Sequence, residues 1–554
     1  MNKKVCSFPI LFALLALLIG ACAVVFPASA QAAPTSTVSI TVSGTVASSY
    51  DAYQIFSANV VDGDSDAKIA TDLAWASDAV RDAALPVLHS AGMPNSQTTA
   101  QEAAEWLNAD FHLTSALSAQ LARSLQSSDA VPLNAGTASE LPCGYWLIVA
   151  DDDSISQGEA GTAPVMALVG GSAVTVKPKA ATPKVVKHVL EDSTAAWQKA
   201  ADATVADDLY WRLSATVPAG LTAYDTYTVQ FVDTMSAGLD PSKVAASMHV
   251  YVAAGADGDF DAVSTSKDGR VGTDPAKGWT DITAQCATKV ATDGKTFAVR
   301  TGDLIAALGG ADAFTAGARV VAVYNAPLNS ACSHGIAKGN PNEVYLRYPR
   351  SPFADQSGDA GFTRTPSDDA CAYTWDLALI KRGSDGDKPL AGAVLSIADD
   401  RGRTLAADGM WDAEGKATVT TGEDGRVTVS GVDSGKLEVR ELKAPKGYTA
   451  FEGTRSVTVK AEGLDVKQVA AAKPKLTITA ESPLRADSAD GSTGSLEASL
   501  INTPTGTPPS ITTGGFMPST GDMAMYAAAA AAVAGAALIV VALLVKRGGG
   551  SHKE

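Results

Sequence analysis

The segment at residues 523–545 is the feature that most constrains this chain, because it is apolar and contains no charged residue. Roughly 23 residues at about 1.5 Å each cross a bilayer once as a helix. Lys546 and Arg547 follow directly, and a basic pair holds that end of a span on the cytoplasmic side. We therefore predict a transmembrane segment at 522–545 and a cytoplasmic tail at 546–554, with the folded part of the chain outside.

The start of the chain has the regions of a secretory signal peptide. Two lysines precede an apolar run at 8–25, and small residues follow up to Ala30 and Ala33. This order predicts export and cleavage near one of these alanines, with the signal peptide at residues 1–30. Roughly 480 residues then lie between the two terminal signals, which is enough for about three domains.

The composition indicates β-rich exported domains. The net charge of −17 argues against a nucleic-acid partner and suits a soluble surface protein. Aromatic residues make up only 6% of the chain, and Thr, Val, Gly and Asp are frequent, as in short strands joined by turns. The histidines stand in no HExxH or triad-like context, so a turnover enzyme is not expected.

Four cysteines remain after removal of the signal peptide: Cys143, Cys286, Cys332 and Cys371. Four cysteines allow three pairings, and the sequence does not choose among them. We predict a Cys286–Cys332 disulfide because both residues fall within one expected domain, and free thiols are the alternative. The sequence contains no CxxC spacing that would indicate a metal site. No cofactor is predicted.

Changes of pattern divide the chain into three expected domains. The first mixes strand-like alternation with a helix that the capping box Thr99-x-x-Glu102 would open. The second and third contain short alternating segments separated by turns, which predicts immunoglobulin-like β-sandwiches and a mainly β fold class. The domains are expected at 34–176, 184–372 and 373–505, with a basic linker at 177–183 and a Thr-, Pro- and Gly-rich spacer with a terminal motif at 506–521.

Several segments resemble one class of Gram-positive surface proteins. Residues 517–521 resemble the LPxTG sorting signal, with Met517 in place of Leu. Residues 389–393 and 435–448 resemble the hallmark segments of a B-type collagen-adhesin (CnaB) domain. Residues 50–56, 233–239 and 339–342 resemble segments of the N-terminal and middle domains of sortase-assembled shaft pilins. The resemblance covers nearly the whole mature chain and implies a major pilin built from CnaA- and CnaB-like sandwiches.

The resemblance also implies how subunits join. A sortase would cleave between Thr520 and Gly521 and pass the Thr520 carbonyl to an amine of the next subunit. Residues 176–179 resemble the pilin motif of the family, which makes Lys179 the expected acceptor, with Lys184 as a further candidate. The expected partners are pilus-specific and housekeeping sortases, identical subunits, minor pilins and cell-wall peptidoglycan. The sorting motif consists of Met517, Pro518, Ser519, Thr520 and Gly521.

Shaft pilins of this family carry intramolecular isopeptide bonds between Lys and Asn, assisted by a nearby acid. Residues two apart in a strand share a face. A polar residue that is separated by an even number of positions from buried Leu and Val residues of its strand, here said to have their parity, is therefore expected to point inward. Lys68 is the single lysine of the first domain and lies in an acidic stretch that reads as a loop, so no bond is expected there. The predicted sets are Lys381–Asn502 with Glu441 and Lys187–Asn342 with Asp233, and Asn340 has the same parity as Asn342.

Burial supplies the chemical reason for such a bond. A buried lysine and a buried carboxyl are costly as ions, and desolvation lowers the pKa of the amine and raises that of the acid. A neutral amine is a nucleophile, and a protonated carboxyl can donate a hydrogen bond to the Asn carbonyl oxygen and polarise it for attack. Each reaction occurs once, so we expect autocatalysis during folding and no enzymatic turnover.

The sequence therefore predicts the structural backbone subunit of a covalent surface pilus that is attached to the cell wall after transient membrane insertion. The alternative is a wall-anchored adhesin or minor pilin that uses the same domains to bind a host-surface ligand. The acceptor-like Lys179 at the first domain junction favours the shaft subunit.

Overall fold

The computed structural model describes residues 36–506, except 45, 65–66, 110–111, 162, 180–181 and 266–270. The predicted signal peptide, sorting motif and transmembrane segment lie outside the described residues. Among the helices that are described, none combines the length and apolar character of a membrane span.

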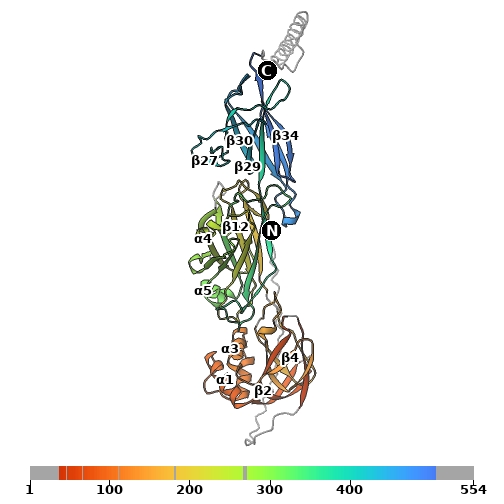
Figure 1. The fold of residues 1–554 in the computed structure, drawn as a ribbon. Coiled ribbons are helices and arrows are strands. Elements are labelled where there is room, and N and C mark those ends of the chain that lie inside the picture. The colour runs from red at the N-terminus through yellow and green to blue at the C-terminus, as the bar shows by residue number, and fades with distance from the viewer. Residues whose placement is uncertain are drawn as a thin grey trace, which may run out of the picture.

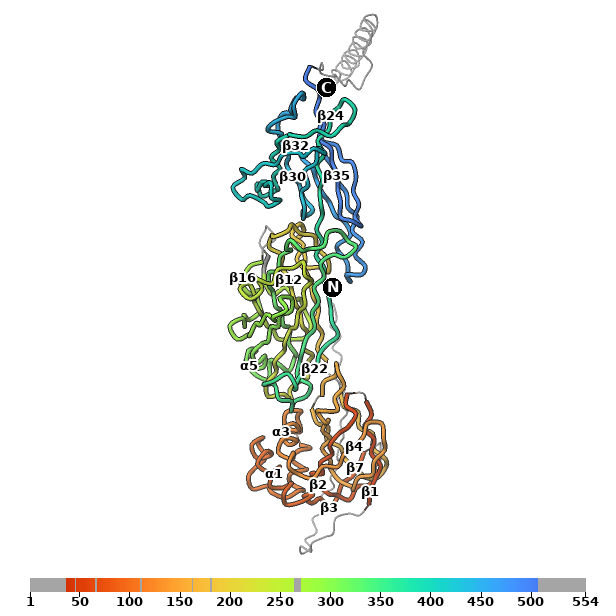
Figure 2. The backbone as a smooth tube through the Cα atoms, viewed as in Figure 1, coloured from red at the N-terminus to blue at the C-terminus, as the bar shows by residue number. Residues whose placement is uncertain are grey.

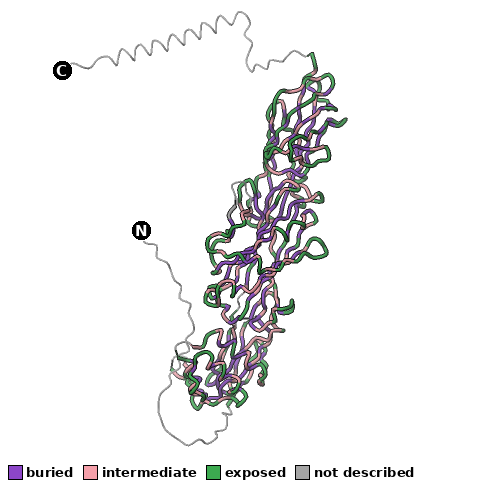
Figure 3. The backbone as a smooth tube through the Cα atoms, turned by 90° about the vertical axis from the view of Figure 1, so that its left-hand side faces the viewer, coloured by how far each residue is buried: buried purple, intermediate pink, exposed green. Residues whose placement is uncertain are grey.

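Three groups of β-sheets follow one another along one long axis, with the N-terminal group at one end and the C-terminal group at the other (Figure 1, Figure 2). The mainly β fold class that the sequence predicted is confirmed. Figure 3 shows buried backbone inside each group and exposed segments along the outer edges. Each group has its own buried apolar core, so we describe them as the N-terminal, middle and C-terminal units.

The N-terminal unit combines two sheets, of order β5-β1-β8 and β3-β2-β6-β7, with three helices. β4 pairs with β2 at the side of the second sheet. Close to the β2–β6 pairing, Gly144 has φ of +145°, and a Cβ there would lie 2.1 Å from the Phe56 carbonyl oxygen, so only glycine fits. The elements are β1 (Thr37–Val42), β2 (Ser49–Asp62), β3 (Lys68–Trp75), α1 (Asp78–Ser90), α2 (Ala100–Asn108), α3 (Ser115–Leu125), β4 (Val131–Asn134), β5 (Ala138–Pro142), β6 (Gly144–Ala150), β7 (Val165–Val169) and β8 (Val174–Val176).

The predicted capping box opens α2. The Glu102 backbone N–H donates to Thr99 Oγ1 at 3.3 Å, and the Thr99 N–H donates to Glu102 Oε2 at 3.0 Å. These two bonds satisfy donors that the first helical turn would otherwise leave unpaired. The helix turns its alanines and Leu107 into the core of this unit.

The middle unit is a sandwich of two sheets, of order β10-β9-β12-β20-β14-β17 and β11-β23-β21-β13-β19-β18. β22 pairs with β21, and β15 and β16 form a separate hairpin. The strands are β9 (Lys184–Glu191), β10 (Ala196–Gln198), β11 (Ala200–Asp202), β12 (Tyr210–Val217), β13 (Gln230–Met235), β14 (His249–Ala254), β15 (Val263–Thr265), β16 (Val271–Pro275), β17 (Thr280–Asp281), β18 (Ala287–Val290), β19 (Thr296–Arg300), β20 (Ala318–Asn325), β21 (Asn340–Pro349), β22 (Phe362–Arg364) and β23 (Asp368–Tyr373). Short helices α4 (Val244–Ser247), α5 (Leu304–Ala307) and α6 (Ala311–Phe314) lie in the connections between its strands.

The C-terminal unit is also a two-sheet sandwich. One sheet has the order β29-β24-β35-β31 with β34 beside β35, and the other has the order β27-β26-β25-β30-β32-β33 with β28 beside β25. The first and last strands, β24 and β35, are parallel neighbours. The strands are β24 (Trp375–Gly383), β25 (Val394–Ala398), β26 (Thr404–Leu405), β27 (Trp411–Asp412), β28 (Val419–Thr420), β29 (Arg426–Val432), β30 (Gly435–Lys443), β31 (Tyr448–Thr449), β32 (Thr454–Glu462), β33 (Lys475–Ala480), β34 (Leu484–Asp490) and β35 (Ser495–Pro504).

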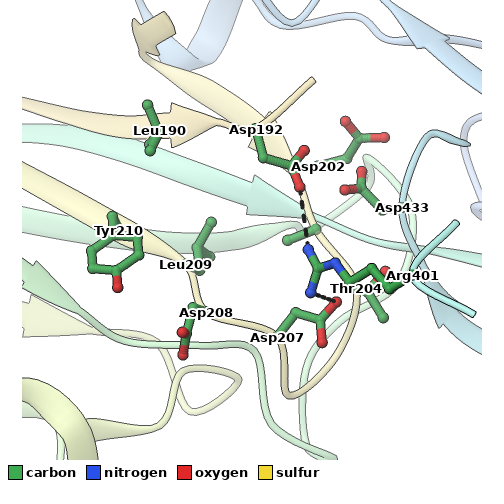
Figure 4. Close-up of a pocket in the computed structure, with 11 residues that line it drawn as sticks. Leu190, Asp192, Asp202, Thr204, Asp207, Asp208, Leu209, Tyr210, Arg401 and Asp433 are labelled. Atoms are coloured by element: carbon green, nitrogen blue, oxygen red, sulfur yellow. Dashed lines mark hydrogen bonds and ion pairs between the residues drawn. The ribbon is translucent and has the colours of Figure 1, made fainter. Parts of the chain in front are cut away.

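Charged side chains lock the middle unit to the C-terminal unit around a cavity of about 180 Å³ (Figure 4). Arg401 of the C-terminal unit points between Asp192 and Asp207, with ion pairs of 3.8 Å and 3.0 Å. Trp375 Nε1 donates to Asp202 Oδ2 at 2.7 Å across the same junction. The two sandwiches therefore meet through hydrogen-bonded and ionic contacts as well as through apolar packing.

The predicted Cys286–Cys332 disulfide is wrong, because all four cysteines of the described chain are free. The Cys286 thiol donates to the Ile282 carbonyl at 3.2 Å. Cys332 Sγ instead lies 3.5 Å from His334 Nε2. Membership of one domain was the only ground for the pairing, and it does not bring two sulfur atoms together.

Candidate functional site: two buried lysine–acid–asparagine clusters

Lys381, Glu441 and Asn502 come together in the core of the C-terminal unit, as their parity predicted. Lys381 Nζ lies 2.5 Å from Asn502 Oδ1 and 2.9 Å from Glu441 Oε1. Asn502 Nδ2 donates to the same Glu441 oxygen at 2.9 Å. Lys381 and Asn502 belong to the paired strands β24 and β35, whereas Glu441 reaches in from β30 of the facing sheet. One carboxyl oxygen thus touches both the amine and the amide nitrogen.

The surroundings of this cluster exclude water. Lys381 is 1% exposed, and its Nζ lies 5.4 Å from the centre of the Phe451 ring. The second Glu441 oxygen accepts the Phe451 backbone N–H at 3.0 Å, which fixes the carboxyl. Burial lowers the pKa of the Lys381 amine, and the neighbouring Glu441 only partly opposes that shift. The amine is therefore closer to its neutral, nucleophilic form than an exposed lysine is.

The contact between acid and amide differs from the sequence-based hypothesis. That hypothesis had the carboxyl polarise the amide oxygen, but Glu441 contacts the amide nitrogen, and Lys381 contacts the oxygen. In this arrangement the acid faces the group that would leave as ammonia.

The middle unit encloses a second cluster. Lys187 of β9 forms an ion pair with Asp233 of β13, and both side chains are fully buried. Asn342, which is 0% exposed, lies on β21 next to β13. Lys187 thus extends from one sheet toward an acid and an asparagine on neighbouring strands of the other sheet.

Tyr324 joins the members of this second cluster, and sequence reasoning missed it. Its hydroxyl lies 2.9 Å from Lys187 Nζ and 3.1 Å from Asp233 Oδ2, and it accepts a hydrogen bond of 2.8 Å from Asn342 Nδ2. Tyr324 shares its inward face of β20 with Val320 and Ala322. The same alternation that indicated the lysine could have indicated this tyrosine.

Burial moves both ionisable partners of the middle cluster toward their neutral forms. It lowers the pKa of Lys187 to about 8, although Asp233 opposes the shift, and it raises the pKa of Asp233 against the effect of Lys187. Asp233 Oδ1 and Asn342 Oδ1 have no hydrogen-bond partner within the described structure. Unsatisfied buried acceptors of this kind raise the free energy of the folded state.

Asn340, the other candidate asparagine, has a different role. Its Oδ1 accepts the Ser333 N–H at 2.8 Å, and its Nδ2 donates to the carbonyls of Ser333 and Ala372 at 2.9 Å and 3.2 Å. Both the oxygen and the nitrogen of the Asn340 amide are therefore hydrogen-bonded, and they stabilise the turn at Ser333. Asn342, in contrast, shares Tyr324 with the lysine.

The remaining candidates lie at the surface. Lys179 is exposed in the linker after β8, and Lys184 is exposed at the start of β9. Pro178 lines a shallow pocket of the N-terminal unit just before Lys179. Lys68 begins β3, where the sequence suggested a loop, and its amine donates to the Gly170 carbonyl at 2.5 Å and pairs with Asp62 at 3.0 Å. Across the described residues, no group of three or more His, Cys, Asp or Glu side chains has the arrangement of a metal site.

The fold and the two clusters define a tandem-sandwich protein that encloses a lysine, an acid and an asparagine in each of two units. Residues 376–473, which make up most of the C-terminal unit, match the family described as SpaA: Prealbumin-like fold domain. The chain is 30% identical over 143 residues to the trypsin-resistant surface T6 protein of Streptococcus pyogenes serotype M6. That match covers 24% of this chain and spans about a quarter, 24%, of the T6 protein.

Solved structures of pilins are similar to this chain over most of its length. The T6 backbone pilin of serotype M6 Streptococcus pyogenes aligns with 86% of this chain and 100% of its own, at 17% identity and a TM-score of 0.45. The major pilin SpaD of Corynebacterium diphtheriae aligns with 86% and 99%, at 14% identity and a TM-score of 0.41. The resemblance to Gram-positive major pilins that the sequence motifs indicated is confirmed by the SpaA domain and the T6 relative.

Proposed function

We propose that this chain is the repeating backbone subunit of a covalently polymerised pilus on a Gram-positive cell surface. The observation that carries the proposal is the placement of Glu441 Oε1 2.9 Å from both Lys381 Nζ and Asn502 Nδ2 in a dry core. A buried ion pair alone is weak evidence of a stabilising role. The amide side chain of Asn502 beside this pair, however, completes the set of amine, acid and amide that a Lys–Asn bond requires.

The reaction in the C-terminal unit follows from these contacts. Neutral Lys381 Nζ attacks Asn502 Cγ, and Glu441 Oε1 takes the proton that the new ammonium must lose. The same oxygen then gives that proton to Asn502 Nδ2, the C–N bond of the amide breaks, and ammonia leaves. A Lys381–Asn502 amide forms and Glu441 is regenerated. Each such bond forms only once in a molecule, so the protein is a structural subunit that modifies itself and not a turnover enzyme.

The middle unit would perform the same exchange with different parts. Lys187 is the nucleophile, Asn342 is the amide, and Asp233 is the acid that moves the proton. Tyr324 lies between Lys187 and Asn342 and is placed to relay the proton to the leaving nitrogen. The product is a Lys187–Asn342 amide that links the two facing sheets.

Subunits would be joined by sortase chemistry. The Thr520–Gly521 peptide bond breaks, and the Thr520 carbonyl forms an amide with Lys179 of the next subunit. Lys179 lies in the linker between the N-terminal and middle units, whereas the described chain stops at the far end of the C-terminal unit (Figure 1). A donor that follows the C-terminal unit in the sequence and an acceptor on the far side of the middle unit suit head-to-tail polymerisation. A housekeeping sortase would then attach the fibre, with its minor pilins, to peptidoglycan.

Intact-mass measurement of the purified protein tests the internal bonds. We expect a mass lower than that of the mature sequence by two ammonias, and Glu441→Ala should restore one of them. Asp233→Ala should restore the other. A mass equal to that of the unmodified sequence would reject both bonds.

Co-expression with a pilus-specific sortase tests the assembly. The unaltered chain should give a ladder of high-mass species that survives boiling in detergent, and Lys179→Ala should remove it. Lys184→Ala is the matched control and should leave the ladder intact. A ladder that persists without Lys179 and disappears without Lys184 would move the acceptor to Lys184, and a chain that gives no ladder at all would contradict the shaft function.

A further inference from the structure

A cysteine, a histidine and an aspartate form a row across the junction between the middle and C-terminal units. Cys332 Sγ lies 3.5 Å from His334 Nε2. On the other side of the ring, His334 Nδ1 forms an ion pair of 2.8 Å with Asp376 Oδ2, at an angle outside hydrogen-bond geometry. Cys332 and His334 come from the segment before β21, and Asp376 comes from β24. This nucleophile, imidazole and orienting carboxylate are unrelated to the lysine clusters.

The backbone around this row is held in place from both units. The Cys332 N–H donates to the Asn329 carbonyl at 3.1 Å, and the Gly335 N–H donates to the Thr374 carbonyl at 3.1 Å. Gly335 packs so tightly that a Cβ there would lie 2.5 Å from the Thr493 backbone carbon. Asn340 fixes the turn between Cys332 and His334 through both hydrogen bonds to Ser333. The three side chains are therefore preorganised by the folded junction.

The imidazole carries positive charge beside the sulfur. Contacts with Asp376 and with Cys332 raise the pKa of His334 to about 10, against a smaller opposing effect of burial. His334 is thus protonated at neutral pH. The protonated imidazole places a positive charge and a hydrogen-bond donor beside the Cys332 sulfur, which is the nucleophilic atom.

Access separates Cys332 from the other thiols. Cys143 and Cys371 are buried, whereas Cys332 is half-buried in a turn whose neighbour Ala331 is exposed. Cys286 is equally half-buried, but its thiol donates to a backbone carbonyl, and burial raises its pKa to about 11. Cys332 alone among the four combines access with a neighbouring imidazolium in the described structure.

We propose that Cys332, activated by His334 and oriented through Asp376, is a covalent modification site for small disulfides. The Cys332 thiol gives its proton to solvent, and the thiolate attacks one sulfur of a disulfide RS–SR. The S–S bond breaks, a Cys332–S–SR mixed disulfide forms, and the RS⁻ that leaves takes up a proton. The site adds a redox-dependent group to an exported protein at the joint between two of its units.

The experiment treats the purified protein with oxidised glutathione and follows each cysteine by peptide mass mapping. Cys332 should acquire glutathione at least about tenfold faster than Cys286, because Cys286 has no neighbouring imidazolium and burial raises the pKa of its thiol to about 11. His334→Gln and Asp376→Asn should each remove this advantage. Equal rates for Cys332 and Cys286 in the unaltered protein, or an unchanged Cys332 rate in His334→Gln, would overturn the proposal.

Cys371 reports whether a variant has merely opened the junction, because it is buried beside the C-terminal core. It should stay unmodified in both variants. If it becomes reactive, the pH dependence of the unaltered protein decides the question. An advantage over Cys286 that comes from the imidazolium shrinks as the pH rises past about 10, where His334 loses its proton, whereas an advantage that comes from exposure alone persists and overturns the proposal.

Discussion

Asn342 donates a hydrogen bond of 2.8 Å to the Tyr324 hydroxyl, which itself lies 2.9 Å from Lys187 Nζ. In the C-terminal unit a carboxyl oxygen occupies the corresponding place between the amine and the amide nitrogen. The two units therefore bring lysine and asparagine together by different means. This difference leads to the first prediction.

Tyr324→Phe should slow or prevent formation of the middle bond, because the ring remains but the hydroxyl that contacts all three partners is lost. The measured mass should rise by one ammonia in all or part of the molecules, while the C-terminal bond is unaffected. Phe297→Leu, which alters the ring packed 4.8 Å from Tyr324 without removing the hydroxyl, is the control. A fully formed bond in Tyr324→Phe would show that Asp233 moves the proton unaided.

Asn342→Ala and Asn340→Ala should separate the two candidate asparagines. Asn342→Ala should raise the mass by one ammonia apart from the substitution itself, because it removes the amide that reacts. Asn340→Ala should keep the bond and loosen the turn at Ser333, since both of its bonds to Ser333 are lost. The opposite pattern of masses would assign the bond to Asn340.

Asn502→Ala should lower the free energy of unfolding of the C-terminal unit by about 4–5 kcal/mol, the chain entropy that closing a loop of this size removes from the unfolded state. Lys381 and Asn502 are 121 residues apart. The substitution keeps the Lys381–Glu441 ion pair but also removes the contacts of Asn502 with both residues, so the lost stability combines the covalent link with these contacts. Denaturant unfolding followed at two wavelengths measures this change in the free energy of unfolding. A change near zero would mean that the unaltered protein contains no Lys381–Asn502 bond.

The junction between the middle and C-terminal units should depend on pH through Glu191. Glu191 is only 3% exposed. This burial is the main cause that raises the pKa of Glu191 from 4.5 to about 7, and the charge of the nearby Asp202 is the second. Between these two values the folded protein holds a proton that the unfolded chain has released. Stability therefore falls as the pH rises through this window.

Glu191→Gln should reduce this dependence, because glutamine has the shape of the protonated acid and does not titrate, and the neighbouring Asp192 and Asp433, whose pKa values burial also raises, account for what remains. Thermal unfolding followed at several pH values between 4.5 and 7 gives the comparison. Asp312→Asn, on the short helix α6 away from the junction, is the matched control. Parallel pH profiles for the unaltered protein and Glu191→Gln would contradict the prediction.

The alternation of strands made much of this protein predictable. Lys381, Glu441 and Asn502 were found because each shares a face with aliphatic residues, and all three are buried. The capping box likewise located the start of α2. In both cases a local pattern fixes the direction of a side chain, and the resemblance to shaft pilins supplied the expectation that the lysine, the acid and the asparagine meet across 121 residues.

Contacts between elements far apart in the chain were less accessible. Tyr324 is separated from Lys187 by 137 residues, and Asp376 meets His334 only because two domains pack together. The triad-like row was therefore missed by reading histidine contexts along the sequence. The disulfide prediction failed for the same reason, since proximity of two sulfur atoms depends on side-chain direction in three dimensions.

The position of Asn342 gives the middle unit a property that the C-terminal unit lacks. Asn502 lies near the end of β35, so its bond would enclose almost the entire C-terminal sandwich. Beyond Asn342, however, the rest of β21 and then β22 and β23 lie between the proposed bond and the next unit, and hydrogen bonds and apolar packing hold them without a covalent link. If the bond forms as proposed, a subunit pulled from both ends would release these strands before the strands inside the bond, so each repeat of the fibre would absorb a sudden load by lengthening this segment.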